Sequence, residues 1–350
     1  METPQNVLKI EEKVLLAPLT TLKIGGTARF FVRAETENQV IEAMNFADEN
    51  DFPVFVLGGG SNVLIADKGF DGLVLQIALM GIEVQENLIT AQAGEDWDEF
   101  VAFCVKRKLA GIECLSGIPG LVGGTPIQNV GAYGQEVSET IRAVRVYDRK
   151  TKEILELNTE ECKFTYRTSL FNTTEKNRFI VLAVTYLLTE NGKPKIVYKD
   201  LLDFFDGKRP SLKQTREAVC EIRAKKAMLV RQGGLDSNSA GSFFKNPIVS
   251  NEHFAKIVEI AENTGIQTVP NFPVNENQVK IPAAWLIEQS GFQKGFQKGR
   301  AGLSTKHTLA LTNRGNATAE EIIELKNEIQ SKVIGKFNIE LIPEPVFIGF

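Results

Sequence analysis

The chain contains two glycine-rich segments whose composition is typical of phosphate binding. Residues 57–62 read LGGGSN, and residues 116–134 read SGIPGLVGGTPIQNVGAYG. Glycine adopts positive φ without strain and lets backbone amides come close to a ligand, and successive exposed amides form anion-binding nests. Two such segments in one chain predict a long, phosphate-bearing ligand that is held from both sides.

The spacing of these glycines excludes two common nucleotide motifs. A Rossmann fingerprint needs a third glycine at the position of Val63, and a Walker motif needs Gly-Lys-Ser/Thr, which neither segment contains. The ligand is therefore expected to be a nucleotide or dinucleotide that is bound in another way. For residues 58–60 taken alone, a tight turn between two strands is an equally good interpretation.

A serine in an unusual setting is a candidate acid. Ser242 lies in residues 241–247 (GSFFKNP), next to a glycine and two aromatic residues. A nucleophilic serine would need a base, and the two histidines, His253 and His307, offer no local support for one. A proton-donating serine needs no such base, and the lysine and asparagine that follow could contact phosphate or sugar groups. A hydroxyl that only caps the start of a strand is the alternative.

Two further side chains could bind or stabilise negative charge. Arg167 follows Tyr166 in a polar stretch between expected strands. Its planar guanidinium would suit a carboxylate if it points inward, and otherwise it is a surface arginine. Glu344 stands between Pro343 and Pro345 with apolar residues on both sides. The prolines hold its backbone extended, and a carboxylate fixed there is costly unless it has a function.

Composition and charge narrow the function classes. The 350 residues are 43% hydrophobic and 24% charged, with a formal net charge of −4. This balance predicts a globular protein with a full core and argues against binding along a nucleic acid. Neither a signal peptide nor a membrane span is expected, since no apolar run approaches the roughly 18 residues that a span needs. Four widely spaced cysteines fit a reducing cytoplasm, and the histidine spacing predicts no metal site.

Mixed helix and strand patterns must position these residues. Apolar spacing and capping pairs predict a helix that opens after Asp96 and further helices at 37–50, 212–229, 251–263, 282–290 and 319–333. Short apolar runs predict two strands within 72–93 and further strands at 53–57, 141–148 and 179–188. The regular alternation of a doubly wound parallel sheet is absent. We therefore expect an α+β protein of three parts, with a linker over residues 231–240.

Taken together, these motifs resemble the UDP-N-acetylenolpyruvoylglucosamine reductase family, in its longer type with a tyrosine loop. The residues that carry the resemblance occur in family order along nearly the whole chain: 57–62, 117–134, Tyr166-Arg167, 241–247, residues 283–287 (AAWLI) and Pro343-Glu344. Each motif is modest, whereas their ordered combination is specific. The resemblance implies a cytoplasmic flavoenzyme that makes UDP-N-acetylmuramate for peptidoglycan.

The resemblance also implies a domain organisation. A two-subdomain FAD-binding module of the vanillyl-alcohol-oxidase (PCMH) type would be followed by a C-terminal α/β substrate-binding domain. The first FAD-binding subdomain is expected at 1–75, joined by the C-terminal tail 338–350. The second subdomain is expected at 76–230, and the substrate-binding domain at 231–337.

Site residues follow from the same resemblance. Arg167, Ser242 and Glu344 fall on the family's catalytic positions. Positions expected to bind FAD lie in the two glycine-rich segments: Leu57, Gly58, Gly59, Gly60, Ser61, Asn62, Ser116, Gly117, Ile118, Pro119, Gly123, Gly124, Gln128, Asn129, Gly131, Ala132 and Tyr133. Positions expected to bind substrate are Tyr133, Tyr166, Arg167, Tyr198, Lys226, Asn246 and Gln297.

The implied reaction carries a hydride from NADPH to non-covalently bound FAD and then to C3 of the enolpyruvyl ether of a UDP-sugar. Negative charge would develop at C2 and its carboxylate. Arg167 would bind and polarise the carboxylate, and Glu344, protonated or hydrogen-bonded, would help to stabilise the enolate. Ser242 would then protonate C2.

Two other functions remain open at this point. A flavin-dependent oxidase of the same fold would often tether its flavin through histidine or cysteine, and neither residue occurs in the glycine-rich segments. A non-catalytic nucleotide-binding protein would have no use for Arg167 or Glu344. No nucleic-acid or membrane partner is expected. The oligomeric state is not fixed by the sequence, although a monomer is favoured.

Overall fold

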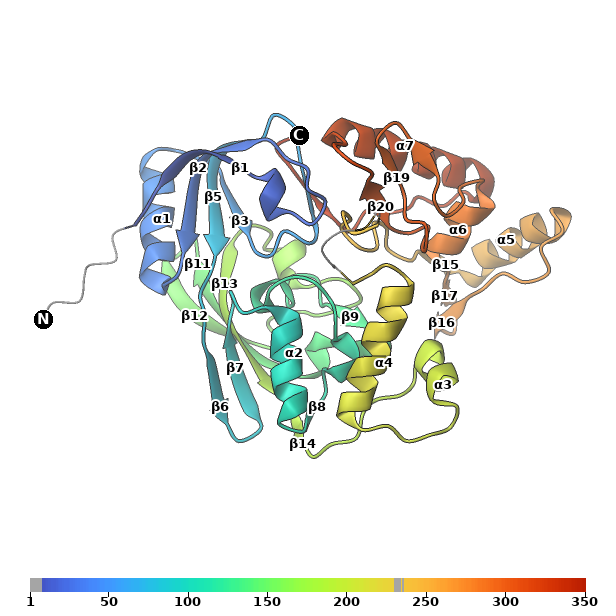
Figure 1. Cartoon of the computed structure of the whole chain (residues 1–350), viewed down its shortest axis with the longest axis horizontal. Helices are drawn as coiled ribbons and strands as arrows, with labels where there is room; N and C mark the ends of the chain where they lie inside the picture. Colours follow the sequence, from blue (N-terminus) through green and yellow to red (C-terminus); the bar gives the residue numbers. More distant parts are fainter. Residues whose placement is uncertain (1–7, 230–233, 235) are drawn as a thin grey trace, which may run out of the picture. The chain divides into compact units, whose positions relative to one another are not determined.

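The computed structural model describes residues 8–229, 234 and 236–350 (Figure 1). The chain folds into two compact units. Unit 1 comprises residues 1–16, 27–60 and 69–230, and unit 2 comprises residues 17–26, 61–68 and 231–350. The chain therefore passes from unit 1 to unit 2 within the first glycine-rich segment, directly after Gly60.

A four-stranded sheet and one helix form the first part of unit 1. The strand order is β1-β2-β5-β3, in which β1 is antiparallel to β2 while β2 and β3 both run parallel to β5. The strands are β1 (Glu11–Leu15), β2 (Thr27–Ala34), β5 (Phe70–Ile77) and β3 (Val54–Leu57). Helix α1 (Glu37–Glu49) packs on β2 and β5 with Val40, Met44 and Ala47 buried, which is the spacing of one helix face.

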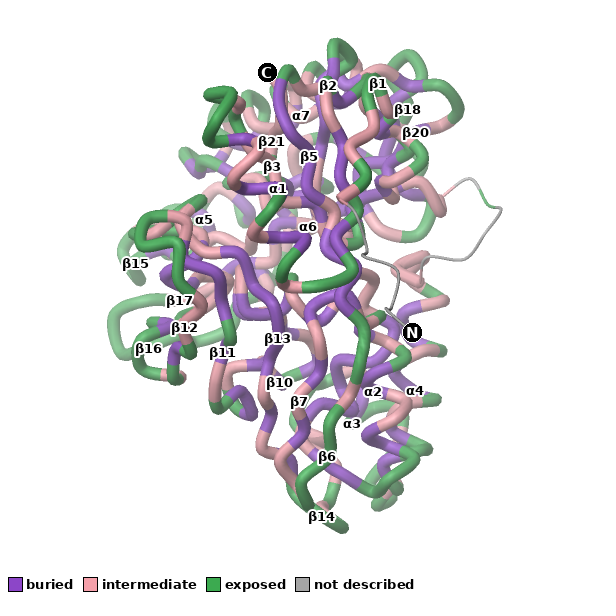
Figure 2. Tube along the Cα trace, turned by 90° about the vertical axis from the view of Figure 1, so that its left-hand side faces the viewer, coloured by how far each residue is buried: buried purple, intermediate pink, exposed green. Residues whose placement is uncertain are grey.

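A five-stranded antiparallel sheet forms the second part of unit 1. Its order is β12-β11-β13-β7-β6. The strands are β12 (Glu153–Asn158), β11 (Ile141–Asp148), β13 (Phe179–Leu187), β7 (Leu88–Gln92) and β6 (Ile82–Gln85). Buried residues run along β13 (Figure 2). Helix α2 (Trp97–Lys106) covers this strand through Phe100, whose ring centroid lies 5.1 Å from that of Tyr186.

Smaller elements complete unit 1. Two-stranded pairs join β8 (Leu109–Ala110) with β14 (Thr189–Glu190), and β9 (Gly131–Ala132) with β10 (Gln135–Glu136). Helix α3 (Lys199–Phe205) contacts α4 (Leu212–Lys225). Helix α4 begins with the capping box that its sequence predicts, since the Ser211 hydroxyl accepts from the Gln214 N–H at 3.3 Å and Gln214 Oε1 accepts from the Ser211 N–H at 2.9 Å.

In the described residues of unit 2 there are three α-helices and three small sheets. The helices are α5 (Asn251–Asn263), α6 (Ala283–Gln289) and α7 (Ala319–Phe337). One three-stranded sheet has the order β15 (Ile248–Ser250), β17 (Gln278–Lys280) and β16 (Phe272–Asn275). The other has the order β18 (Gln297–Lys298), β19 (Ala301–Leu303) and β20 (Leu311–Asn313). The third sheet pairs β21 (Val346–Ile348) parallel to β4 (Val63–Ile65).

Helix α7 organises the core of unit 2. Its buried stripe, at helical spacing, is Ile322, Leu325, Ile329, Val333 and Phe337. Burial of each such side chain contributes about 1.5–3 kcal/mol. The N-terminus of α7 is held by Thr318 and by the Asp67 carboxylate, which accepts from the Ala319 N–H at 2.9 and 3.0 Å. A carboxylate at this end of the helix also complements the helix dipole.

Several predicted element bounds differ from those observed. Helix α4 ends at Lys225 instead of residue 229, α7 continues four residues past Val333, and residues 72–93 contain parts of three strands instead of two. Pro282 caps α6 instead of occupying its first turn. The predicted linker includes residues 231–233 and 235, which lie outside the described part of the chain. The three-domain division, with its tail 338–350, stays a prediction.

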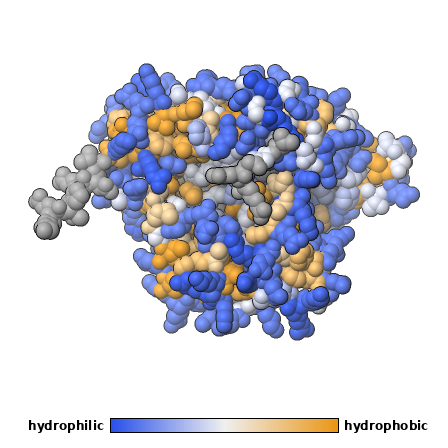
Figure 3. Space-filling model, viewed as in Figure 1, coloured by the Kyte–Doolittle hydropathy of each residue, from blue (hydrophilic) through white to orange (hydrophobic). Residues whose placement is uncertain are grey.

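Hydrophilic residues predominate on the face that Figure 3 shows, and hydrophobic ones form separate small groups. This is the usual appearance of a globular protein whose large apolar residues are mostly inside. Across the residues that the structure describes, none of the helices combines the length and the apolar character needed to cross a membrane.

Candidate active site

Within unit 1, residues 58–59 of the first glycine-rich segment lie against residues 120–121 of the second. A Cβ atom added to Gly59 would stand 2.9 Å from the Cα atom of Gly120, and one added to Gly58 would stand 4.0 Å from a methyl carbon of Leu121. Gly60 and Gly120 have φ of +63° and +126°. Only glycine permits both this backbone approach and these conformations without strain. The two glycine loops are therefore neighbours, and their glycines permit the close approach.

Charged side chains from α2 and α4 hold the start of the second segment. The Gly117 N–H donates to Asp98 Oδ1 at 2.5 Å, and the Gly117 carbonyl accepts from Arg223 Nε at 3.1 Å. Asp98 also accepts from both terminal nitrogens of Arg216, at 2.5 and 2.8 Å. Burial alone would raise the pKa of Asp98, but the hydrogen bonds from Arg216 and Gly117 hold it below its usual value.

The end of the second segment meets Arg167. Arg167 Nη2 donates to the Gly131 carbonyl at 2.5 Å, and a Cβ atom on Gly131 would lie 3.2 Å from Arg167 Nη1. Asn129 is 1% exposed, and its amide donates to Glu136 at 2.8 Å and to the Thr165 carbonyl at 3.0 Å. The turn that carries Arg167 is thus fastened to the predicted cofactor segment.

Two tyrosines predicted to bind substrate contact each other. The rings of Tyr133 and Tyr198 meet edge to face, with centroids 5.5 Å apart and planes at 84°. Burial raises the pKa of Tyr133 to about 12 and also raises the pKa of Tyr198. Both hydroxyls therefore keep their protons at neutral pH and are available as hydrogen-bond donors.

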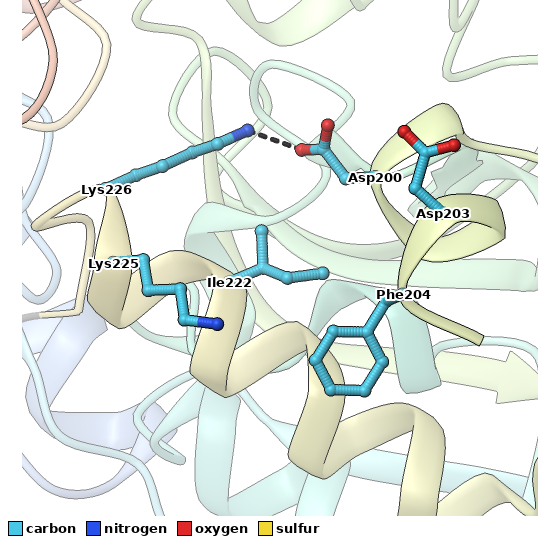
Figure 4. A pocket seen from close by; sticks show the side chains of 6 residues that line it. All are labelled: Asp200, Asp203, Phe204, Ile222, Lys225 and Lys226. Carbon is cyan, nitrogen blue, oxygen red and sulfur yellow. Dashed lines mark hydrogen bonds and ion pairs between the residues drawn. The ribbon is translucent and has the colours of Figure 1, made fainter. Parts of the chain in front are cut away.

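A lysine from α4 completes the predicted substrate residues in unit 1. Lys226 follows the last residue of α4, and its ammonium forms an ion pair with the carboxylate of Asp200 in α3 (Figure 4). Tyr166 lies beside Arg167, with the guanidinium carbon 5.7 Å from its ring centroid. Unit 1 thus carries the glycine segments together with Arg167, the tyrosines and Lys226.

In unit 2 the structure brings the segments of Ser242 and Glu344 together. The Glu344 N–H donates to the Phe243 carbonyl at 2.9 Å, and the Lys245 N–H donates to the Ile342 carbonyl at 2.9 Å. Phe244 forms an antiparallel bridge with Pro343. Phe243 therefore lies opposite Glu344, and Ser242 directly precedes Phe243 in the chain. Two residues separated by about 100 positions in the sequence therefore share one short ladder.

Asn62 fixes the same segment from another side. Its side-chain amide donates to the Glu344 carbonyl at 3.2 Å, and its own carbonyl accepts from the Val346 N–H at 3.0 Å. The sequence predicts Asn62 as a FAD-binding residue but gives no sign of its contacts with Glu344 and Val346.

The side-chain oxygen of Asn246 accepts from the Ala283 N–H at 2.8 Å and so caps the N-terminus of α6. Gln297 is exposed in β18, where its amide donates to the Gly299 carbonyl at 2.9 Å.

Comparison with known proteins identifies the family. A model of the C-terminal domain of UDP-N-acetylenolpyruvoylglucosamine reductase matches residues 233–348, and a FAD-binding-domain model matches residues 28–158. UDP-N-acetylenolpyruvoylglucosamine reductase of Streptomyces coelicolor is 45% identical over 95% of this chain and 89% of its own length. That of Thermobifida fusca is 44% identical over 96% of this chain and 97% of its own length.

The chain belongs to the UDP-N-acetylenolpyruvoylglucosamine reductase family. A solved structure of the reductase from Thermus caldophilus agrees, with a TM-score of 0.69 and 25% identity over 98% of this chain and 100% of that one. Family membership confirms the resemblance stated from the sequence. It also confirms the expected α+β fold, with a FAD-binding module followed by a C-terminal domain.

The cofactor of this family module is FAD, and the residues present fit it. The matched range 28–158 spans both glycine-rich segments. Where the two segments meet, Gly59 approaches the backbone of Gly120, and the side chain of Leu121 lies beside them. Such a surface suits a pyrophosphate that is bound by main-chain amides. In the parts of the chain that the structure describes, no group of histidine, cysteine and acidic residues could hold a metal ion.

Sequence reasoning missed several residues that support this site. Asp98, Arg216 and Arg223 hold the Gly117 turn, and Asp200 pairs with Lys226. A signal for Arg223 exists in the sequence, because its spacing of four residues from Val219 places it on the apolar face of α4; in the structure it is 8% exposed. A buried arginine implies a specific partner, but the sequence does not say which one.

Proposed function

We propose that this protein reduces UDP-N-acetylglucosamine enolpyruvate to UDP-N-acetylmuramate, with NADPH as the reductant, in peptidoglycan precursor synthesis. The observation that carries this proposal is similarity to UDP-N-acetylenolpyruvoylglucosamine reductases, which are 40–45% identical to this chain over nearly its whole length. Bound FAD would supply the hydride acceptor and donor that link NADPH to the substrate.

We assign three catalytic residues from this chain. Arg167 binds the carboxylate of the enolpyruvyl group and stabilises the charge that develops there. Glu344, protonated or hydrogen-bonded, helps to stabilise the same charge. Ser242 delivers the proton to C2 after hydride addition at C3, so that one hydride and one proton together saturate the double bond.

The contacts of these residues support the proposed roles. The side chain of Arg167 donates to the Gly131 carbonyl of the cofactor segment, and the ladder between residues 243–245 and 342–344 holds Ser242 and Glu344 near each other. Fixed groups of this kind stabilise developing charge without reorganisation during the reaction. For the substrate we assign Tyr133, Tyr166, Tyr198, Lys226, Asn246 and Gln297, and for FAD the residues of the two glycine-rich segments named above.

Four further statements belong to the same proposal. The protein works in the cytoplasm as a monomer, its flavin is held without a covalent bond, and its chain divides into the three domains expected above. Light scattering of the purified holoprotein tests the monomeric state, because a monomer must show the mass of a single chain with one FAD.

An anaerobic titration in two steps tests the reaction. NADPH added to the oxidised holoprotein should bleach the flavin, and the enolpyruvyl UDP-sugar should then restore its colour. A flavin that NADPH reduces but that only oxygen reoxidises would favour an oxidase of the same fold. A protein that binds nucleotides without consuming NADPH would favour the non-catalytic alternative.

A further inference from the structure

An open depression lies between helices α3 and α4 in unit 1. Its volume is about 390 Å³, and its lining residues are Asp200, Asp203, Phe204, Ile222, Lys225 and Lys226 (Figure 4). The two acidic residues come from α3, and the two lysines come from the end of α4. One of these four charged residues, Lys226, is also a residue that we assign to substrate binding.

The two lysines of the depression have different partners. Lys225 pairs with Glu221 one turn earlier on α4, at 2.7 Å, as is common on an exposed helix face. Lys226 instead crosses to α3, where its ammonium contacts Asp200. The side chains of Lys226 and Asp200 are 36% and 31% exposed, so this ion pair is in contact with solvent. Asp203, one turn later on α3, lines the same depression but is drawn without a contact to Lys226 in Figure 4.

Asp200 also links Lys226 to the tyrosine contact. Tyr198 is the N-cap of α3, and its carbonyl accepts from the N–H groups of Leu201 and Leu202 at 2.9 and 3.0 Å. Its ring contacts Tyr133. The seven-residue helix α3 therefore carries, two positions apart, a ring and a carboxylate that each touch a different residue assigned to the substrate.

We propose that Asp200 is an internal counterion of Lys226, which the diphosphate of the substrate must displace. This proposal rests on the proposed function, because it takes Lys226 as the residue that binds an anionic group of a nucleoside diphosphate sugar. Two anions that share one ammonium repel each other, so the carboxylate has to give way when the diphosphate arrives. Asp200 therefore lowers the affinity for substrate.

The expected change in substrate affinity is modest because the side chains of Lys226 and Asp200 are each about one-third exposed to solvent. Ion pairs in contact with solvent are weak, and breaking one costs no more than about a fivefold change in an equilibrium constant. We expect Asp200→Asn to bind the enolpyruvyl UDP-sugar about threefold to fivefold more tightly than the wild type. The readout is the Kd by titration calorimetry on the oxidised holoprotein without NADPH, so that no turnover occurs. In steady state, KM should fall by a similar factor while kcat does not rise.

Asp203→Asn is the matched control. It removes the same charge from the same helix and the same depression but leaves the pair of Asp200 and Lys226 intact. Its Kd should stay within twofold of the wild type. FAD content and thermal unfolding of each variant check that the fold is retained. Equal tightening in both variants would reveal a long-range charge effect and would overturn the counterion role.

Lys226→Met separates failure of this inference from failure of the site assignment. If Lys226 binds the diphosphate, Lys226→Met binds the substrate more weakly than the wild type. The double variant Lys226→Met/Asp200→Asn should then bind it no more tightly than Lys226→Met alone. Weaker binding by Asp200→Asn alone would mean that Asp200 positions Lys226 instead of competing for it, and the proposal would be wrong while the site stands. Unchanged binding by Lys226→Met would remove Lys226 from the substrate site, and the counterion proposal would fall with it.

Discussion

At the scale of single residues, the decisive assignment is that of Ser242 as the proton donor. Ser242→Ala should leave reduction of the flavin by NADPH intact and slow its reoxidation by the enolpyruvyl substrate by at least about 10²-fold, because only the second half-reaction needs a proton at C2. Stopped-flow measurements of the two half-reactions check this. Equal losses in both would indicate a damaged fold and defeat the assignment.

Single residues also show which contacts could be predicted from the sequence and which could not. The types and spacing of the two glycine segments predicted that they act together, and the approach of Gly59 to Gly120 agrees. The partner of Lys226 was not predictable, because Asp200 is one of many acidic residues and only the packing of α3 on α4 selects it. The contact of Asn62 with Glu344 likewise depends on β21 pairing with β4, which joins segments far apart in the sequence.

At the scale of elements, the structure of the first glycine loop predicts how a substitution at Gly59 changes FAD binding. Gly59→Ala should reduce FAD binding by at least about tenfold, because the new methyl group would stand 2.9 Å from the Cα atom of Gly120 and the loops would have to separate. The FAD content of the purified variant and its affinity on reconstitution measure this.

Gly335→Ala in α7 is the control for a change from glycine to alanine. Nothing lies within 4 Å of a Cβ atom at this helical position, so the variant should be as stable as the wild type or more stable by about 0.5–1 kcal/mol. Full FAD binding by Gly59→Ala would show that the loops need not touch.

The ion pair between α2 and α4 makes stability depend on pH. The pKa of Asp98 is lowered in the folded state, so its stabilising effect is present above the unfolded pKa and is lost as the pH falls through the folded pKa. Asp98→Asn should therefore cost about 1–2 kcal/mol of unfolding free energy near pH 7. The difference should shrink below a pH of about 4, which denaturant titrations at several pH values can follow.

Asp71→Asn serves as the comparison, since Asp71 pairs with Arg29 at 3.2 Å but is 84% exposed. An exposed pair contributes little, so this variant should match the wild type at every pH. A pH-independent cost for Asp98→Asn would show that its charge is not what holds the Gly117 turn.

Element ends illustrate a limit of local sequence reasoning. Capping boxes predicted the starts of α4 and α7 correctly, because Ser211 with Gln214 and Thr318 with Glu321 make their bonds within one turn. The far ends were predicted less well. Helix α7 continues to Phe337 since that ring packs against Trp285, with centroids 5.5 Å apart, and this tertiary contact has no signature in the sequence of α7.

At the scale of the whole molecule, the cofactor links binding to stability. The FAD-binding range 28–158 covers parts of the four-stranded and the five-stranded sheet of unit 1, so FAD should stabilise the folded state without affecting the unfolded chain. For a non-covalent ligand, FAD at 100 times its Kd adds about 2.7 kcal/mol, and each further tenfold adds about 1.4 kcal/mol. The Tm of deflavinated protein should therefore rise steadily with the FAD concentration. A flavin that stays with the chain after denaturation, or a Tm that ignores added FAD, would contradict non-covalent binding and favour the oxidase type of attachment.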